Sequence, residues 1–286
     1  MIILDLSQIY YSIVSTQIDF TGKTKTEISS DFMRHVLLNC IRSHRKKWKN
    51  DYGEIVIACD SHKSWRREIF PYYKIHRKKE RQKINIDWKF IHTFLDEMKA
   101  DLKEFFPYIV IEIEKAEADD VIATILYNYH DKEKNLILSG DKDFIQLHYL
   151  NNVDQYDPIK KRWIKNNNPH KYLTEHIVRG DVGDGIPNIR SLDESLAHNI
   201  RQKPITQKFL NSFLDFKTHL ISQDVLRNMK RNKALIDLSE IPVSIKQKII
   251  DEFENQSITK TRIGNSILSY FMEKGLKNLI TDINDF

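Results

Sequence analysis

The chain has 286 residues, 41% of them hydrophobic, and a formal net charge of +5, which predicts one large domain or two with a real core. Its longest apolar runs fall far short of the ~18–20 residues that a membrane span needs, which excludes a membrane protein. Because no signal segment opens the chain either, we expect a soluble protein that stays in the cytoplasm.

The first part of the chain alternates apolar runs with amphipathic segments. The opening MIILDLS predicts a buried strand with Asp5 at its carboxyl end. Residues 27–49 predict a helix, because apolar side chains recur there near helical spacing and basic residues gather at its end. GEIVIACD then predicts a second buried strand, which Asp60 closes.

A basic stretch with interleaved aromatic residues follows at 61–83. It carries nine basic and two acidic residues, so its charge of +7 exceeds that of the whole chain. Acidic partners that would pair with a solvated helix, the alternative reading of a charge run, are nearly absent. Because aromatic rings can stack on bases, we expect this stretch to bind nucleic acid. The candidates for that contact are Arg66, Arg67, Lys78, Lys79, Arg81 and Lys83.

Carboxylates cluster after the next two predicted strands. A helix is predicted at 88–106, a strand at 108–114, a helix at 117–129 and a strand in NLILSGD, while 153–157 predicts the last strand. Five acids lie at the edges of these apolar runs: Glu117, Asp119, Asp120, Asp141 and Asp143. Two such charges ~4 Å apart at an effective dielectric of ~20 repel by ~4 kcal/mol. They therefore either protonate or share a cation.

The order of these elements predicts where the carboxylates meet. Strands that alternate with helices indicate an α/β fold with a mostly parallel central sheet flanked by helices. In such sheets, ligands bind at the carboxyl ends of the strands, where all these acids lie. Hard oxygen ligands suit Mg²⁺ or Mn²⁺, and a two-metal carboxylate site serves displacement at phosphorus. The alternative is that the acids merely favour the start of a helix.

The pattern becomes helical beyond Pro169. We predict an α/β core over 1–168, with the basic stretch forming a separate element at about 61–87, and a helical region over 169–286. The loop GDVGDGIPN carries Asp181 and Asp184, which either join the metal site or only order a glycine-rich turn. The histidines are scattered without a metal-ligand pair, and none is assigned to metal.

These motifs, in this order, resemble the flap endonuclease and 5′-nuclease superfamily, and most closely the ribonuclease H group of T-even bacteriophages. The resemblance covers nearly the whole chain and rests on MIILDLS, VIACD, RREIFPYYKIHRKK, EAEADD, SGDKDFIQL, GDVGDGIPN and the C-terminal NKALIDLSEIP. It implies a PIN-like core with a helical arch, and a 5′ to 3′ exonuclease with flap endonuclease and RNase H activity. Such enzymes remove RNA primers and 5′ flaps during DNA replication.

The resemblance also implies roles for single residues. It implies two Mg²⁺ ions, which Mn²⁺ can replace. The ligands of the first are Asp5, Asp60, Glu117 and Asp119, with Asp120 adjacent. Those that hold or position the second are Asp141, Asp143, Asp181 and Asp184. Lys74 and Arg77, with the neighbouring Tyr73, would reach the scissile phosphate from the arch. A monomer is expected in the cytoplasm, of the host if the protein is viral. DNA, RNA–DNA hybrids and 5′ flaps are its implied substrates, and a single-strand binding protein and a sliding clamp its implied partners.

One departure and two alternatives complete the prediction. Gly185 replaces the usual asparagine, and no Gly-Ile-Gly turn follows, so the duplex clamp of the superfamily is not predicted. A PIN-like single-strand ribonuclease would share the sheet and acidic site but would not need the basic arch. A non-catalytic nucleic-acid scaffold would bind without metal-dependent cleavage.

Overall fold

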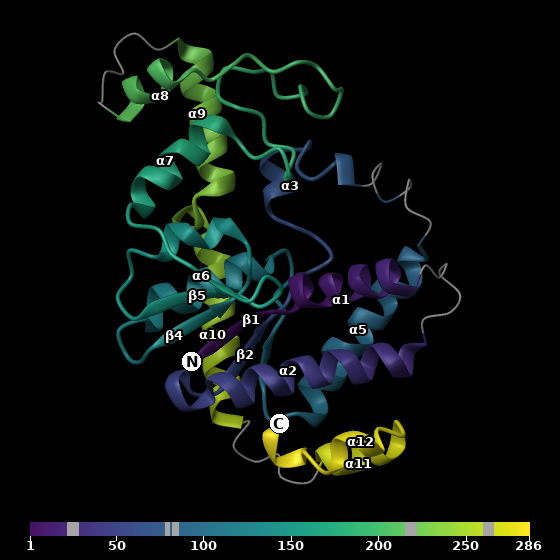
Figure 1. Cartoon of the computed structure of the whole chain (residues 1–286). Coiled ribbons are helices and arrows are strands. Elements are labelled where there is room, and N and C mark those ends of the chain that lie inside the picture. Colours follow the sequence, from purple (N-terminus) through teal and green to yellow (C-terminus); the bar gives the residue numbers. More distant parts are fainter. Residues whose placement is uncertain (22–28, 78–80, 82–85, 215–221, 260–265) are drawn as a thin grey trace.

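A six-stranded sheet lies at the centre of the protein (Figure 1). The computed structural model describes residues 1–21, 29–77, 81, 86–214, 222–259 and 266–286. The strand order is β3-β2-β1-β4-β5-β6. The bounds are β1 (Ile2–Asp5), β2 (Ile55–Ala58), β3 (Ile109–Ile111), β4 (Asn135–Leu138), β5 (Val153–Asp157) and β6 (Arg162–Ile164). Strands β1 to β5 are parallel and only β6 is antiparallel, so the predicted α/β fold class is confirmed.

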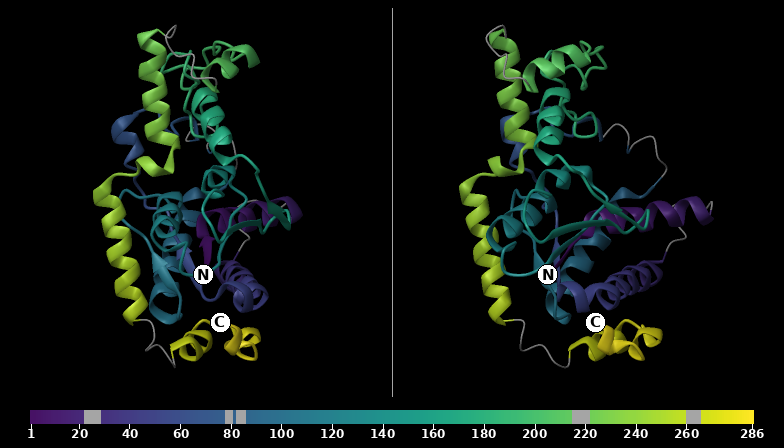
Figure 2. Two further views of the ribbon diagram at one scale, coloured as in Figure 1. Left: turned by 90° about the vertical axis from the view of Figure 1, so that its left-hand side faces the viewer. Right: turned by 60° about the vertical axis from the view of Figure 1, so that its left-hand side comes forward.

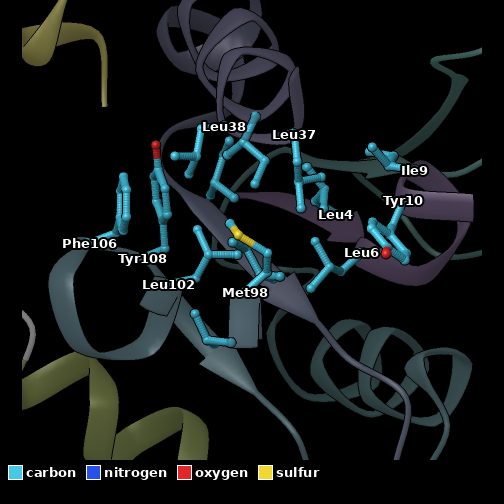
Figure 3. Close-up of a cluster of buried hydrophobic side chains, with 14 of the residues drawn as sticks. Leu4, Leu6, Ile9, Tyr10, Leu37, Leu38, Met98, Leu102, Phe106 and Tyr108 are labelled. Atoms are coloured by element: carbon cyan, nitrogen blue, oxygen red, sulfur yellow. The ribbon is translucent and has the colours of Figure 1, made fainter. Parts of the chain in front are cut away.

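One face of the sheet is covered by helices α1 (Leu6–Thr21), α2 (Ser30–Tyr52) and α5 (Trp88–Phe105). Side chains from these helices interlock with alternate residues of β1 and β2 in a dry cluster (Figure 3). Helices α11 (Ser266–Glu273) and α12 (Lys277–Ile280) and the 3₁₀ turn η5 (Ile283–Asp285) extend this layer. Burial of so many apolar side chains, each worth ~1.5–3 kcal/mol, fixes the sheet from this side.

The opposite face is covered by α6 (Ala118–Tyr129), η1 (Lys142–Leu147), η3 (Leu238–Glu240) and α10 (Val243–Thr259). Helix α10 also closes the edge of the sheet. The Gln256 side chain accepts a hydrogen bond from the Val110 backbone N–H (2.9 Å) and donates one to its carbonyl (2.7 Å). An edge strand otherwise presents unpaired backbone groups, so this side chain takes the place of a neighbouring strand.

A helical group lies beyond the sheet, at the upper end of Figure 1. It comprises α3 (Arg66–Ile69), α7 (Pro169–Arg179), α8 (Gln207–Leu214) and α9 (Gln223–Ile236). Phe70 and Tyr73, at the base of the predicted arch, pack against Ile177 of α7 and Leu235 of α9. Helices α9 and α10 follow one another along one side of the molecule (Figure 2). Within the described residues, no helix has both the length and the apolar character to cross a membrane.

Candidate active site

Asp5 and Asp60 stand side by side at the carboxyl edge of the sheet. Asp5 is the last residue of β1, and Asp60 lies two residues beyond β2. The Asp5 carboxylate accepts hydrogen bonds from the Gln8 backbone N–H (3.0 Å) and the Ser139 hydroxyl (3.2 Å). Burial raises the pKa of Asp5 to about 7, and the negative charges of Asp60 and Asp141 add to that increase. The predicted convergence of distant acids is therefore present in the structure.

Helix α6 brings Glu117 and Asp119 to the same edge. Glu117 caps the helix, and its backbone N–H donates to Asp120 (2.9 Å), which forms a capping box. Asp60 accepts from the Ala118 backbone N–H (2.8 Å) and so orients the start of the helix toward β2. Burial raises the pKa of Asp119 well above its ordinary value, and the negative charge of Asp141 is the second cause of this increase. Uncompensated negative charge of this kind fits a divalent cation.

Asp120 and Arg66 form a buried pair directly beside Glu117. Asp120 is fully buried, and its two oxygens accept from the Arg66 guanidinium (2.8 and 3.1 Å) and from the Trp65 indole N–H (3.0 Å). Asp120 therefore supports the site from the core, and its expected place beside the first metal ion stays a prediction. Arg66 is only 3% exposed and also donates to the Leu235 carbonyl (2.9 Å), so its predicted contact with nucleic acid is contradicted.

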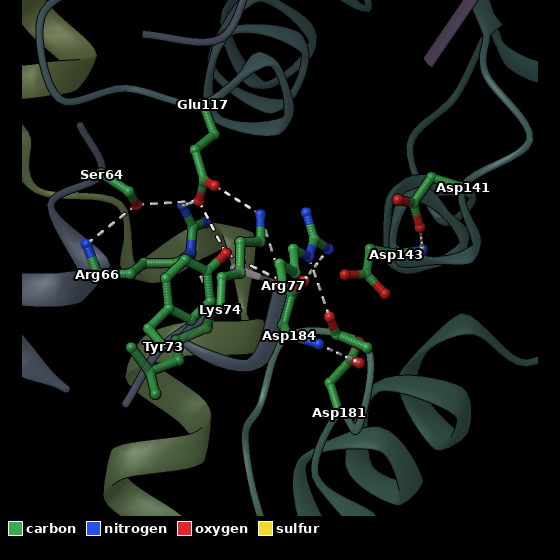
Figure 4. Close-up of polar contacts among 12 residues, drawn as sticks. Ser64, Arg66, Tyr73, Lys74, Arg77, Glu117, Asp141, Asp143, Asp181 and Asp184 are labelled. Atoms are coloured by element: carbon green, nitrogen blue, oxygen red, sulfur yellow. Dashed lines mark hydrogen bonds and ion pairs between the residues drawn. The ribbon is translucent and has the colours of Figure 1, made fainter. Parts of the chain in front are cut away.

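Lys74, Arg77 and Tyr73 point into the acidic site (Figure 4). The Lys74 ammonium donates to Glu117 (2.6 Å), and the Arg77 guanidinium donates to Asp184 (2.6 Å). The Tyr73 hydroxyl lies 2.8 Å from Glu117 and 2.9 Å from Asp184, between the two carboxylates. Burial alone would raise the pKa of Glu117, but the charges of Lys74 and Arg66 outweigh it and hold that pKa at about 2.

Asp141 and Asp143 follow β4 in a tight turn. Asp141 caps η1 by accepting from the Asp143 backbone N–H (2.9 Å). The buried Gln155 of β5 donates to the carbonyls of Ser139 (2.9 Å) and Asp141 (2.6 Å) and thereby holds the turn. Burial, and after it the charge of Asp141, raise the pKa of Asp143 to about 8. This pair therefore continues the region of excess negative charge.

The loop after α7 supplies Asp181 and Asp184. Asp181 accepts from the Asp184 backbone N–H (3.0 Å), and Ile186 N–H donates back to the Asp181 carbonyl (2.7 Å), which closes the loop. A backbone hydrogen bond joins this loop to the basic stretch: the Lys74 N–H donates to the Asp184 carbonyl (2.8 Å). Gly185 has a φ of +74°, and a Cβ there would lie 3.1 Å from the Tyr72 carbonyl oxygen. Close contact with the arch explains the glycine at this position.

His176 of α7 is a site residue that the sequence did not reveal. Its Nε2 lies 3.2 Å from Asp181 and its Nδ1 lies 3.5 Å from Asp143. These three side chains form a group of possible metal ligands among the described residues. The sequence carried no signal for it, because its acidic neighbours come from a different loop and a different turn.

The predicted nucleic-acid residues outside the site fall into two groups. Arg67 is exposed, and the Arg81 guanidinium lies over the Trp88 ring, 5.3 Å from its centroid. Their roles stay predictions. The remaining three, Lys78, Lys79 and Lys83, lie outside the described residues.

Comparison with known proteins identifies the family. Residues 2–178 match the family model of the 5′-3′ exonuclease N-terminal resolvase-like domain. The chain belongs to the 5′-3′ exonuclease family. Residues 171–286 of this nuclease match the T4 RNase H C-terminal model. The recognition made from its motifs is thus confirmed.

Individual relatives agree with this assignment. The nuclease is 32% identical to the ribonuclease H of Enterobacteria phage T4, over 99% of its own length and 95% of that protein. It is 28% identical to a 5′-3′ exonuclease of Buchnera aphidicola subsp. Acyrthosiphon pisum, over 75% of its length and 79% of that protein. It is accordingly an enzyme of the nuclease class, a hydrolase of phosphodiester bonds, and its predicted function as a 5′ to 3′ nuclease is confirmed.

Solved structures share its fold. A flap endonuclease of bacteriophage T5, co-crystallised with metal ions, superposes with a TM-score of 0.62 at 17% identity and covers 89% of the nuclease and 98% of the T5 chain. A second T5 structure with the same scores is a complex with DNA and metal ions. Both were crystallised with metal ions, and the described residues of the nuclease include one group of possible metal ligands, Asp143, His176 and Asp181.

Proposed function

We propose that the nuclease uses two Mg²⁺ ions to cleave RNA primers and 5′ flaps from duplex DNA, and that Mn²⁺ can replace Mg²⁺. The observation that carries this proposal is the set of carboxylates gathered at the carboxyl edge of the sheet, where burial and then neighbouring negative charge raise the pKa of Asp5, Asp119 and Asp143. The T4 relative is named for activity on RNA–DNA hybrids, and a T5 neighbour is a flap endonuclease in complex with DNA. Those names support hybrids and flaps as substrates.

The carboxylates divide between the two proposed ions by their position on the sheet. The ligands of the first are Asp5, Asp60, Glu117 and Asp119, and those of the second are Asp141, Asp143, Asp181 and Asp184. Oxygen donors of this charge and hardness suit Mg²⁺. Asp5, Asp119, Asp141 and Asp143 support this assignment most directly, because burial and then neighbouring negative charge raise the pKa of each, and a bound cation would relieve that cost.

The cations of the arch have a separate task. When bound, the Mg²⁺ ions activate water and stabilise the leaving oxygen, so no protein nucleophile is required. Lys74 and Arg77 stabilise negative charge that develops on the phosphate oxygens. The Tyr73 hydroxyl bonds to both Glu117 and Asp184 and holds these carboxylates in place. Because Lys74 pairs with Glu117 and Arg77 pairs with Asp184, Tyr73 also orients these two side chains.

The surroundings of the site determine how the substrate is held. Arg67 and Arg81 contribute to a basic surface that binds the phosphate backbone, together with the predicted Lys78, Lys79 and Lys83. The nuclease acts as a monomer in the cytoplasm during DNA replication, with a single-strand binding protein and a sliding clamp as partners. A salt-sensitive affinity for DNA is the direct consequence of this surface.

Two substitutions test the proposal. Asp119→Asn and Asp141→Asn each remove one ligand charge while they keep the side-chain shape. Cleavage of a 5′-labelled flap and of an RNA–DNA hybrid is measured with Mg²⁺, and Asp251→Asn on the exposed face of α10 is the matched control. We expect the cleavage rate of both site variants to fall about 100-fold or more. This is the loss that removal of a single electrostatic contact at an active site usually causes. Undiminished cleavage would remove the two-metal argument.

A further inference from the structure

One nitrogen donor stands among the oxygens of the active site. The groups that Asp143, His176 and Asp181 offer as ligands all lie within 4.8 Å of one another. The rest of the predicted ligand set consists of carboxylates alone. An imidazole changes the chemistry of such a site, because nitrogen is a softer donor than oxygen.

Helix α7 fixes the position of the His176 imidazole. The residue lies one turn before the helix ends at Gly180, whose N–H donates to the His176 carbonyl (2.8 Å). Its side chain is only 14% exposed and packs against the Tyr172 ring at a centroid distance of 5.8 Å. The ring is therefore held toward the two aspartates and not toward solvent.

The two ring nitrogens face different carboxylates. Nε2 lies 3.2 Å from Asp181 Oδ2, within hydrogen-bond distance. Nδ1 lies 3.5 Å from Asp143 Oδ1, is buried, and has no hydrogen-bond partner in the described structure. With the proton on Nε2, a lone pair on Nδ1 faces an oxygen lone pair on Asp143. Such a contact is relieved either by a second proton on the ring, which the hydrogen bond to Asp181 and the charge of Asp143 favour by raising the pKa of His176, or by a cation between the two atoms.

The arrangement matches the usual environment of a metal-binding histidine. Such a histidine donates its other N–H to a carboxylate, which fixes the tautomer and the orientation of the ring. Here Asp181 is that carboxylate and Nδ1 is the free donor. Two donor atoms 3.5 Å apart can both bind one ion, since metal–nitrogen and metal–oxygen bonds are each ~2.0–2.2 Å long.

We propose that His176 Nδ1 is a ligand of the divalent ion that Asp143 also binds, and that it biases this site toward Mn²⁺ over Mg²⁺. The inference rests on the proposed two-metal function and adds the nature of the second site to it. Both ions take oxygen ligands, but Mg²⁺ keeps its water and binds nitrogen poorly, whereas Mn²⁺ is a first-row transition ion and accepts an imidazole more readily. The nuclease would then have one metal site with oxygen ligands alone and a second site that also has an imidazole nitrogen.

Spectroscopy on the Mn²⁺-loaded full chain tests this directly. Electron spin echo envelope modulation detects a nitrogen bound to Mn²⁺, and ¹⁵N-histidine labelling identifies its source. The wild-type protein should show this coupling, and His176→Gln should lose it. His170→Gln is the matched control, because His170 lies on the exposed side of the same helix and stacks on Tyr149.

Calorimetry supplies a second readout that does not depend on cleavage. In His176→Gln we expect the Mn²⁺ affinity of one site to fall about 10-fold or more, and the Mg²⁺ affinity to change less than about threefold. If wild type binds metal without nitrogen coupling and the affinities of the variant are unchanged, His176 is only a charged clamp between two aspartates, and this inference fails. If wild type binds no divalent ion at all, the proposed function fails first.

Discussion

Asp5 should destabilise the metal-free protein at neutral and alkaline pH. Its pKa rises from an ordinary 3.8 to about 7, chiefly because it is buried. The folded protein therefore binds a proton more tightly at Asp5 than the unfolded chain does, and its stability falls as pH rises toward 7. At ~1.4 kcal/mol per pKa unit, the cost is about 4 kcal/mol at pH 8 and about 1.5 kcal/mol at pH 5.

The substitution Asp5→Asn removes this cost while the side-chain shape is kept. The amide oxygen still accepts from the Gln8 N–H, and the amide nitrogen can donate to Ser139 in place of the present contact. With metal chelated at pH 8, we expect a gain of about 2–4 kcal/mol, or roughly 3–7 °C in Tm. At pH 5 the gain should shrink by more than half.

The assay is thermal unfolding in a chelator at pH 5, 6, 7 and 8. Asp251→Asn, at an exposed position of α10, controls for the loss of one negative charge. It should move Tm little at any of these pH values. A variant with asparagine at position 5 that unfolds below wild type at pH 8 would refute the reasoning, and so would a wild-type Tm that rises steadily from pH 5 to 8.

Three further predictions concern the cations. Arg66→Met leaves the buried Asp120 without a charged partner and removes one cation from Glu117, so it should lower the free energy of unfolding in urea by about 3–5 kcal/mol, whereas Arg67→Met, at an exposed position, should change it by less than about 0.5 kcal/mol. Lys74→Ala should slow single-turnover cleavage about 100-fold, and a rate within threefold of wild type would exclude its role at the phosphate. Arg67→Gln should reduce the slope of log affinity against log salt by about 0.9, and an unchanged slope would show that Arg67 contacts no phosphate.

The sheet and its acidic edge were predictable because periodicity and strand order fix both. Buried parallel strands read as continuous apolar runs, and carboxylates after them must share one edge. Strand β6 was missed, since an exposed edge strand with Arg162 and Trp163 has no apolar run. The prediction that the sheet ends at 153–157 was therefore wrong.

The fate of each charged side chain was harder to predict. Sequence shows that Arg66 lies in a basic stretch, but not that Asp120 would lie opposite it in the core. His176 joins the site only because α7 is positioned over η1, a contact between segments that no local pattern connects. Whether a charged side chain lies in the core or in the site is decided by contacts between residues distant in the sequence. Local patterns in a single sequence do not reveal these contacts.

The clasp that Gln256 makes on β3 has a consequence for biosynthesis. About 130 residues separate Ile111 from Val243, so α10 leaves the ribosome roughly 7–26 s after the strand that it covers, at ~5–20 residues per second. Until α10 emerges, the edge of β3 is open, and only α6 and η1 are available to cover the apolar face beside it. Such surfaces recruit chaperones or pair with neighbouring chains. Translation speed over the last third of the message should therefore govern the yield of folded nuclease.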